Sequence, residues 1–570
     1  MLDYLFSNGK KFFTKEQPTI LSASAIMMVL ILISKIVGLL TKTIMVSQLG
    51  AEKYGIFVAA NTIPETLSML FIFGSITSVI IPVLVEEIEE KDLKSFSRLF
   101  SSIINVGLLA FVAISVFVLL LADDITPFVI EKIAKPVDPF TQEQIGMISD
   151  MMKWLLLPQV ILGISSFLSS ALNAYKRFVI PQLAPLFYNL GILFGAAVII
   201  PLLGQSAWGI TWGVLLGSVL HLLIQLPLGS HLKIKYKFTI DLASKRLREA
   251  FTISFPRIFS LAADQIALAI DRVLAIGLGA TPLGAYQLAV SLVSMPFSLF
   301  SHTFSVAALP FLSGMYAKKD IKGFVTMFSK VFNQILFLTV PVTMIFLVLR
   351  LPLVRLLYGL MGNEFSWENT LMVAWVVFFF SLGLIPEVML VFLNRVFFAM
   401  HDTVRPLLVG IFTVVGGIVT GLLFTNYFSH FDDFSLRIIY WNPEFFKSKV
   451  DGISAIGGLA LSSSIIYSTS FGLLMILLRK KIGSLGGLRF WGAIIKKIMF
   501  GLVMAVFMYV LFKMWDEVLD TARTINVLIL TSSTMVSGSC LYLWLAYIFK
   551  DPEVGMITKL ISVVRRNFSK

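Results

Sequence analysis

The sequence is poor in charge and almost without cysteine. Of its 570 residues 14% are charged and one is a cysteine, Cys540, whereas 57% are hydrophobic. In soluble domains about a quarter of all residues are charged, so this composition excludes a soluble enzyme, a disordered chain and a coiled coil. A single cysteine also excludes a disulfide framework or a cysteine-based metal site within one chain. The composition predicts a membrane protein.

Motifs of energy-converting and metal enzymes are absent as well. The chain has no G-x-x-x-x-G-K-[ST] phosphate loop, and its five histidines never form H-E-x-x-H. The excess of Lys and Arg falls in short loops rather than on one polar face, which argues against nucleic acid as a partner. We therefore predict a protein that is not an enzyme and uses no cofactor or metal. Its energy would come from an ion gradient, the membrane potential or the substrate gradient.

Long apolar runs dominate what is present. About 20 apolar residues in a helix cross the hydrocarbon layer. This measure predicts an all-α polytopic protein with about 14 transmembrane helices, too long and unbroken for a membrane β-barrel. The predicted spans are 19–46, 55–85, 101–122, 154–174, 180–202, 207–230, 250–277, 283–314, 329–349, 368–398, 404–427, 453–478, 490–512 and 524–549.

Basic residues between the spans predict the orientation. Connections on the same side as the N-terminus hold 31 Lys and Arg, and the other connections hold 11. Cytoplasmic loops carry the excess of basic residues, so both termini are predicted in the cytoplasm. The predicted parts are a cytoplasmic or interfacial segment (1–18), an N-lobe (19–240), a C-lobe (241–485), a last helix pair (486–549) and a cytoplasmic tail (550–570).

Three short matches indicate an internal repeat. KDLKSFSRLF (91–100) resembles KDIKGFVTMF (319–328), LGAEKYG (49–55) resembles LGATPLG (278–284), and NAYKRFVIP (173–181) aligns with FAMHDTVRP (398–406). The offset moves span one onto span seven, and six is an even number of helices. We therefore predict two parallel six-helix lobes plus two C-terminal helices, with a substrate site between the lobes and alternating access.

Charged residues within the spans are the candidate site. Such residues are costly in hydrocarbon and usually face a cavity or a partner. Lys35 and Lys42 lie seven residues apart in span one and so share a helix face. We predict a water-filled cleft with a cationic side. The candidates for substrate binding are Lys35, Lys42, Asn61, Glu65, Arg257, Arg272 and Ser291, and those for ion coupling are Asp264, Asp271 and Glu387.

Several segments resemble one family of lipid transporters. SKIVGLLTKTIMVSQLGA (34–51), TIPETLSMLFIFGSITSVIIPVL (62–84) and ALNAYKRFVIPQLAPLFYNLGIL (171–193) resemble the MurJ lipid II flippase family. So do FFAMHDTVRP (397–406) and GLALSSSIIYSTSFGLLMILLRKKIG (458–483). The pattern F-x-A-x-x-D-T-x-x-P is fairly specific to this branch of the multidrug/oligosaccharidyl-lipid/polysaccharide exporter superfamily.

The resemblance implies a fold and a substrate. It implies fourteen helices in two lobes, a central cationic cavity and a hydrophobic groove at the last two helices. The implied substrate is an undecaprenyl-pyrophosphate-linked peptidoglycan precursor, moved from the inner to the outer leaflet of the bacterial cytoplasmic membrane. Lys and Arg would bind its pyrophosphate, Arg in bidentate fashion.

The chain departs from the family at the cavity arginines. Thr41 and Lys42 stand where the family has Arg and Asp, Ser68 and Met69 where it has paired arginines, and Ser291 where it has an arginine. Only Lys35 stands at a basic family position in span one. Asp271 matches an acidic position that belongs to a sodium site in some relatives. The partners expected on span eleven are not evident around Gly416, Gly417 and Thr420.

Three alternatives remain open at this point. The chain could export another lipid-linked oligosaccharide, or it could be an antiporter of organic cations. It could also be a non-transporting scaffold that recruits cell-wall synthesis proteins through the aromatic outer segment 428–452. That segment could equally be a lid at the membrane boundary, where aromatic side chains favour the interface.

Overall fold

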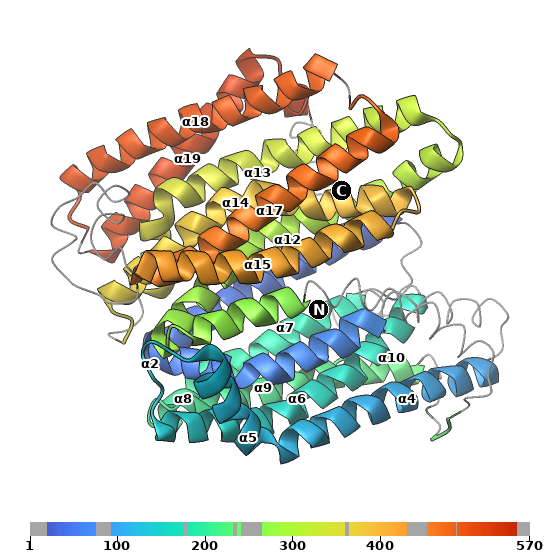
Figure 1. The fold of residues 1–570 in the computed structure, drawn as a ribbon, viewed down its shortest axis with the longest axis vertical. Coiled ribbons are helices and arrows are strands. Elements are labelled where there is room, and N and C mark those ends of the chain that lie inside the picture. The colour runs from blue at the N-terminus through green and yellow to red at the C-terminus, as the bar shows by residue number, and fades with distance from the viewer. Residues whose placement is uncertain are drawn as a thin grey trace, which may run out of the picture. The chain divides into compact units, whose positions relative to one another are not determined.

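The fold is described from a computed structural model of the chain. The described residues are 20–75, 93–175, 177, 179–231, 236, 238–240, 265–359, 364–429, 453–485, 487–521 and 523–555. In these ranges all regular structure is helical, as predicted (Figure 1). The predicted outer segment lies almost wholly outside them, as do the N-terminal segment and most of the C-terminal tail.

The first half of the chain carries α2 (Ile20–Ser75), α4 (Leu93–Leu120), α5 (Ala122–Pro127), η1 (Phe128–Ala134), α6 (Gln142–Ala174), α7 (Val179–Phe194), η2 (Gly195–Ile199), α8 (Ile200–Leu202), α9 (Trp208–Leu223) and α10 (Leu226–His231). Residues 265–276 are helical and lead into the second half. There follow α12 (Ala280–Ala317), α13 (Ile321–Tyr358), α14 (Trp367–Ala399), α15 (Val404–Ser429), α17 (Ile453–Ile482), α18 (Gly487–Val518) and α19 (Thr524–Ile548).

The helices account for the predicted spans. Among the described residues, 12 helices are long and apolar enough to cross a membrane. The first of them, Leu30–Leu70, contains two predicted spans, because Gly50 interrupts α2 with φ 70° and ψ −178°. Helix 265–276 is the described part of the predicted seventh span. The described residues thus account for at least part of each of the fourteen predicted spans, and the all-α polytopic fold is confirmed.

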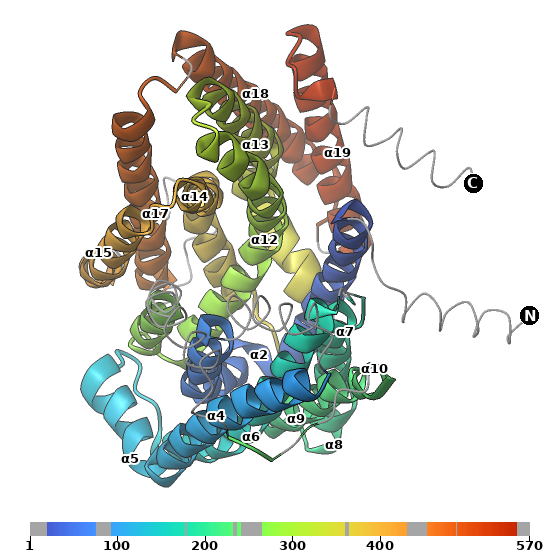
Figure 2. The same ribbon diagram turned by 90° about the vertical axis from the view of Figure 1, so that its right-hand side faces the viewer.

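The described helices form two compact units. The first comprises the described residues up to Gln287 together with 364–366, and the second comprises the rest. The predicted lobe boundaries stay a prediction. In the first unit α9 packs against α6 and α7, and α2 packs against the same two helices (Figure 2).

Glycines bring α7 and the following η2 into close contact with α9. A Cβ on Gly191 would lie 2.3 Å from the Cα of Gly217, and one on Gly195 would lie 2.5 Å from the Cα of Gly213. Small residues spaced by four let membrane helices approach closely, since lipid gives no hydrophobic driving force between helices. The helix pair α7–α9 is therefore held by backbone-to-backbone packing that larger side chains would prevent.

The repeat predicted from the sequence is present as matching contacts within the first unit. A Cβ on Gly55 would lie 1.9 Å from the carbonyl oxygen of Ala280, and a Cβ on Gly284 would lie 2.0 Å from that of Ala51. These four residues occupy equivalent positions in LGAEKYG and LGATPLG. Each repeat thus supplies the glycine that accommodates the other's backbone, which is the reciprocal contact expected for two like-oriented copies.

The first glycine of each of these motifs is also constrained. Gly50 and Gly279 both have positive φ, 70° and 114°. A Cβ on Gly50 would lie 2.9 Å from the Glu364 carbonyl oxygen, and one on Gly279 would lie 3.0 Å from Cβ of Asp138. Glycine is the residue that adopts positive φ without steric cost. The two equivalent turns therefore have the same backbone requirement.

The second unit is built around α14. This helix packs between α13 and α17, and α15 lies against α17. The indole of Trp375 is fully buried, and it fits because Gly457 has no side chain: a Cβ there would lie 2.0 Å from Nε1. The opposite face of α15 is an exposed apolar stripe typical of a helix that faces hydrocarbon. It consists of Val404, Leu408, Ile411, Val415, Val419, Leu422 and Leu423.

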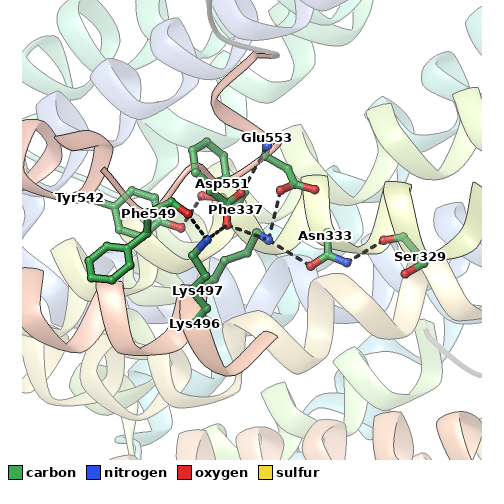
Figure 3. A network of polar contacts seen from close by, with 9 residues as sticks. All are labelled: Ser329, Asn333, Phe337, Lys496, Lys497, Tyr542, Phe549, Asp551 and Glu553. Carbon is green, nitrogen blue, oxygen red and sulfur yellow. Dashed lines mark hydrogen bonds and ion pairs between the residues drawn. The ribbon is translucent and has the colours of Figure 1, made fainter. Parts of the chain in front are cut away.

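A buried ionic cluster joins the chain after α19 to α18 and α13 (Figure 3). Lys497 is fully buried, and its Nζ lies 3.3 Å from Asp551 Oδ2 and 3.2 Å from Glu553 Oε2. It also donates to Asn333 Oδ1 on α13, at 3.1 Å. The neighbouring Lys496 donates to the carbonyl oxygen of Phe549 at 2.7 Å. Because buried charges are stable only when paired, this cluster fixes the end of α19.

The most specific family-like motif forms the turn between α14 and α15. Asp402 Oδ2 pairs with Arg405 at 2.8 Å and with Lys481, at the end of α17, at 2.7 Å. Its Oδ1 accepts from the backbone N–H of Arg405. Although burial opposes ionisation, the hydrogen bonds from Lys481 and from the Arg405 backbone hold the pKa of Asp402 below its ordinary value. Asp402 is therefore an ionised anchor for three helix ends.

Candidate functional site

The core of the candidate site is an ion pair between two predicted site residues. Glu65 lies on α2 after Gly50, and Arg272 lies on helix 265–276. Arg272 Nη1 lies 2.9 Å from Glu65 Oε2, and Nη2 lies 3.3 Å from Oε1. Both side chains are half-buried. Two parallel hydrogen bonds of this kind fix the orientation of both groups.

Asn61 lies one helical turn before Glu65 and is tied to it. Its Nδ2 donates to Glu65 Oε2 at 3.0 Å. Its Oδ1 is buried, and no described residue donates a hydrogen bond to it. Pro64 stands between the two residues and lacks an N–H, so the helical hydrogen bond to the Ala60 carbonyl is missing. This turn thus holds a buried amide oxygen that no described residue satisfies and a backbone carbonyl without its usual helical partner.

Lys42 brings the first predicted span to the same place. It lies on α2 before Gly50, is half-buried, and interacts electrostatically with both Glu65 and Arg272. Lys35 is exposed and interacts electrostatically with Lys42, as expected from their spacing of seven residues. Lys42 therefore adjoins the Glu65–Arg272 pair, and Lys35 adjoins Lys42.

Asp271 faces a tyrosine beside the same group. The hydroxyl of Tyr286, on α12, donates to Asp271 Oδ2 at 3.3 Å. Tyr286 and Tyr54 are both buried, and both interact electrostatically with Arg272. Neither tyrosine was among the predicted site residues, although Tyr54 lies within the repeated motif LGAEKYG. Burial of a phenol beside charged groups was the signal missing from the sequence.

The other four predicted residues belong to the second unit or fall outside the described residues. Ser291 on α12 and Glu387 on α14 are half-buried in the second unit, with Glu387 directly after Pro386. Arg257 and Asp264 lie outside the described residues. The roles of all four stay predictions, as does the cleft between the lobes.

Thr420 and Gly416, two of the positions considered for a sodium site, take part in helix packing. The hydroxyl of Thr420 donates to the Gly416 carbonyl at 2.7 Å and lies 2.6 Å from the hydroxyl of Ser462, on α17. These contacts bind α15 to α17 within the second unit. Asp271 lies in the first unit with Tyr286.

The assembled group is suited to an anion. In the first unit it combines three cations (Lys35, Lys42 and Arg272) with two carboxylates (Glu65 and Asp271). A guanidinium that already holds a carboxylate in bidentate geometry has the donor arrangement that a phosphate group requires. The amide of Asn61 adds both a donor and an acceptor for polar groups such as hydroxyls.

Solved structures of transporters share this fold. The chain superposes on a structure described as lipid II flippase MurJ in an inward closed conformation, with a TM-score of 0.70. The match covers 92% of this chain and 98% of that chain at 19% identity. It also superposes on an inward-facing multidrug resistance MATE family transporter of the MOP superfamily, with a TM-score of 0.63, over 79% of this chain and 95% of that one at 13% identity. The protein has the fold of a multi-pass membrane transporter of this superfamily.

Sequence comparison specifies the branch. A family model described as lipid II flippase MurJ matches residues 45–432, well over half of the chain. The chain belongs to the MurJ family. Relatives include a probable lipid II flippase MurJ of Buchnera aphidicola subsp. Baizongia pistaciae, 23% identical over 71% of this chain and 78% of the relative. Lipid II flippase MurJ of Burkholderia cenocepacia is 22% identical over 70% of this chain and 77% of the relative.

Membership confirms the predicted family, superfamily and class. MurJ is a family of transporters, so the prediction that the chain is not an enzyme is confirmed as well. The matched residues 45–432 contain Asn61, Glu65, Asp271 and Arg272, whereas Lys35 and Lys42 precede them. The described site therefore combines family positions with two lysines just before the matched region.

Proposed function

We propose that the protein moves a lipid-linked peptidoglycan precursor, lipid II, from the inner to the outer leaflet of the bacterial cytoplasmic membrane by alternating access. The observation that carries the proposal is the joining of Lys42, Arg272 and Asn61 in one half-buried group of a MurJ-family chain. The undecaprenyl tail can stay in lipid during the movement. The pyrophosphate and its sugar-peptide head cannot cross hydrocarbon unaided, because burying an unpaired charge is too costly.

The Glu65–Arg272 pair has a specific part in this proposal. Without substrate, Glu65 neutralises the guanidinium, so the site is stable when empty of head group. A pyrophosphate offers the same bidentate geometry with more charge and displaces Glu65 from Arg272. Lys42 and Lys35 then add point charges from the other half of α2, which offset the loss of the family's arginines at nearby positions.

Orientation and coupling belong to the same proposal. The ratio of 31 to 11 basic residues supports cytoplasmic locations for both termini and for the loops that hold the excess. The head group then enters from the cytoplasm and leaves on the opposite side. Na⁺, H⁺ or the membrane potential would supply the energy, with Asp264, Asp271 and Glu387 as candidate coupling residues.

The alternatives are less well supported by the site. An antiporter of organic cations needs carboxylates available to its cargo, whereas Glu65 is bound to Arg272 and Asn61. An exporter of another lipid-linked oligosaccharide would bind the phosphate in the same way. It would differ from a lipid II flippase in which sugar head group it accepts. A scaffold that recruits cell-wall enzymes would not need the buried charges at all.

Complementation tests the proposal directly. The intact gene is expressed in a bacterial strain depleted of its own lipid II flippase, and lipid II exposed on the outer leaflet is quantified. We expect the wild type to restore growth and exposure, and Lys42→Ala or Arg257→Ala to abolish both at unchanged protein levels. Loss of one charge-assisted contact corresponds to about tenfold or more in binding.

Lys53→Ala is the matched control for Lys42→Ala. Lys53 lies on the same helix, is exposed, and donates to the carbonyl oxygen of Gln205 outside the site. It should complement like the wild type. Normal growth of the Lys42→Ala/Arg257→Ala double variant would overturn the site assignment. Failure of the wild type to expose lipid II would overturn the proposal that lipid II is the substrate.

A further inference from the structure

The last two helices depend on one neighbour for their position. Among the described helices, α18 and α19 pack chiefly on each other and on α13. The hydroxyl of Tyr542, on α19, donates to the carbonyl oxygen of Phe337 on α13 at 3.1 Å. A Cβ on Gly501, on α18, would lie 2.4 Å from Cγ1 of Val340 on α13. Many apolar side chains on the other faces of the pair are exposed, so the contacts with α13 decide where the pair lies.

The short segment after α19, residues 549–555, connects all three helices, and we call it the clip. Carboxyl oxygens of Asp551 and Glu553 lie 3.3 Å and 3.2 Å from Nζ of Lys497 on α18 (Figure 3). The same ammonium donates to Asn333 Oδ1 on α13 at 3.1 Å. The clip thus continues α19, neutralises a charge on α18, and reaches α13 through that charge.

The two carboxyl groups of the clip are not equally compensated. Both residues are buried, Asp551 to 4% exposure and Glu553 to 7%, and Lys497 is fully buried. Asp551 has two cationic neighbours, because Lys496 lies 3.7 Å from its Oδ2. Among the described residues, Glu553 forms an ion pair with Lys497 alone. Two carboxylates beside one buried cation disfavour each other's ionisation, so Glu553 is the group that holds a proton.

The surroundings of Glu553 favour its neutral form. The charged and titratable groups around it come from each packed element, with one polar amide: Lys496 and Lys497 of α18, Asn333 of α13, Tyr542 of α19 and Asp551 of the clip. Burial and then Asp551 raise the pKa of Glu553 to about 7, although Lys497 opposes them. The protonated form is therefore the one that fits the closed clip.

We infer that the clip is a proton-controlled switch, which holds α18 and α19 on α13 while Glu553 is protonated and opens when Glu553 is ionised. In the closed state an ionised Glu553 would share one fully buried ammonium with Asp551, whereas water hydrates its charge once the clip has left. By linkage, the closed clip binds a proton that the open clip releases.

Opening the clip changes α18 as well. Without the clip, Lys497 loses both carboxylates of its cluster, and an unpaired charge is costly to keep buried. The end of α18 that carries Lys497 must then move relative to α13. This end and the clip lie on the predicted cytoplasmic side, so the switch responds to cytoplasmic pH, whatever the chain transports.

Hydrogen exchange measures the opening directly, even when the open state is rare. In the closed clip the backbone N–H of Asp551 donates to the Ala546 carbonyl at 2.8 Å, and that of Val554 donates to the Asp551 carbonyl at 3.2 Å. The full-length protein is studied in lipid nanodiscs by mass spectrometry. After correction for the intrinsic effect of pH on exchange, we expect protection of the clip to fall about tenfold between about pH 6 and about pH 8.

Two variants distinguish a proton switch from a plain ion pair. Glu553→Gln cannot ionise and should keep its protection over the whole pH range. Asp551→Asn leaves Glu553 as the single carboxylate beside the lysines, so the fall should become smaller, whereas a plain ion pair would be weakened. Glu517→Gln, at an exposed carboxylate elsewhere on α18, is the matched control and should behave like the wild type.

The outcomes decide the inference without any transport assay. Wild-type protection that does not change with pH would overturn the switch, and so would an equal fall in the wild type and in Glu553→Gln. Failure of lipid II exposure would leave these exchange results unaffected, so the switch and the proposed function stand or fall separately.

Discussion

Single residues show that charge inside this chain is compensated locally. Lys497 is enclosed by Asp551, Glu553 and Asn333, and Asp402 is held by Arg405 and Lys481. The Glu65–Arg272 pair follows the same rule, but it also adjoins Lys42 and the buried oxygen of Asn61. We therefore base the proposed function on the Glu65–Arg272 pair, beside which a further cation lies.

Removing the buried lysine should destabilise the protein strongly. Lys497→Met leaves two carboxylates in the interior, and breaking a buried ion pair from one side costs about 3–5 kcal/mol. Melting of the purified protein in detergent measures the loss. Lys496→Met is the matched control, because Lys496 is partly exposed and lies 3.7 Å from Asp551; its effect should be under about 1 kcal/mol. Equal effects would contradict the importance of burial.

The same cluster should be sensitive to pH. Burial and the neighbouring Asp551 raise the pKa of Glu553 to about 7, above its ordinary value of 4.5. The packed segment therefore binds a proton that the released segment does not. The stability that Glu553 contributes is complete below about pH 4.5 and decreases as the pH rises through about 7. Melting between about pH 5 and about pH 8 should show this slope, and Glu553→Gln should flatten it.

Whole elements are placed by glycine as much as by hydrophobic pattern. The α7–α9 contact and the contact of α2 with α12 both depend on backbones that meet where no side chain intervenes. The sequence predicted the bounds of other helices well: the expected span 404–427 is α15, Val404–Ser429, and the expected span 524–549 is α19, Thr524–Ile548. It did not predict which glycines are contacts, because glycine is common in membrane helices for several reasons.

A substitution at the repeat contact should separate contact glycines from others. Gly284→Ala places a Cβ about 2.0 Å from the Ala51 carbonyl oxygen, so the helices must move apart. We expect a marked fall in melting temperature and in the amount of folded protein. Gly314→Ala, on the same helix, meets nothing within 4 Å and should be neutral or slightly stabilising. A harmless Gly284→Ala would contradict the close approach.

At the scale of the whole molecule, the repeat and the basic residues describe the same architecture. Two like-oriented copies require an even number of helices between equivalent positions, and the shift of six spans from the first to the seventh satisfies this condition. The matching glycine contacts at Ala51–Gly55 and Ala280–Gly284 place the two copies of one motif in equivalent roles. The orientation in the membrane remains a prediction from the positive-inside rule.

Cysteine labelling tests that orientation. Cys540 is the single cysteine and is exposed, so it is first replaced by alanine. Glu143→Cys and Lys318→Cys then introduce exposed thiols in connections of opposite predicted side. In intact cells a membrane-impermeant maleimide should label position 143 and leave 318 unlabelled until the cells are opened. The reverse pattern would mean that the termini are outside.

The sequence by itself determined the class, the spans, the repeat and the family, because each is carried by composition, by run length or by motifs that a one-dimensional pattern records. It also named Lys42, Asn61, Glu65, Asp271 and Arg272, since a charge or an amide in an apolar run is conspicuous. Only the tertiary structure decided which of them meet: Arg272 pairs with Glu65, and Asp271 accepts a hydrogen bond from Tyr286. The physical reason is that hydrogen bonding depends on distances of about 3 Å between side chains hundreds of residues apart, which no local pattern encodes.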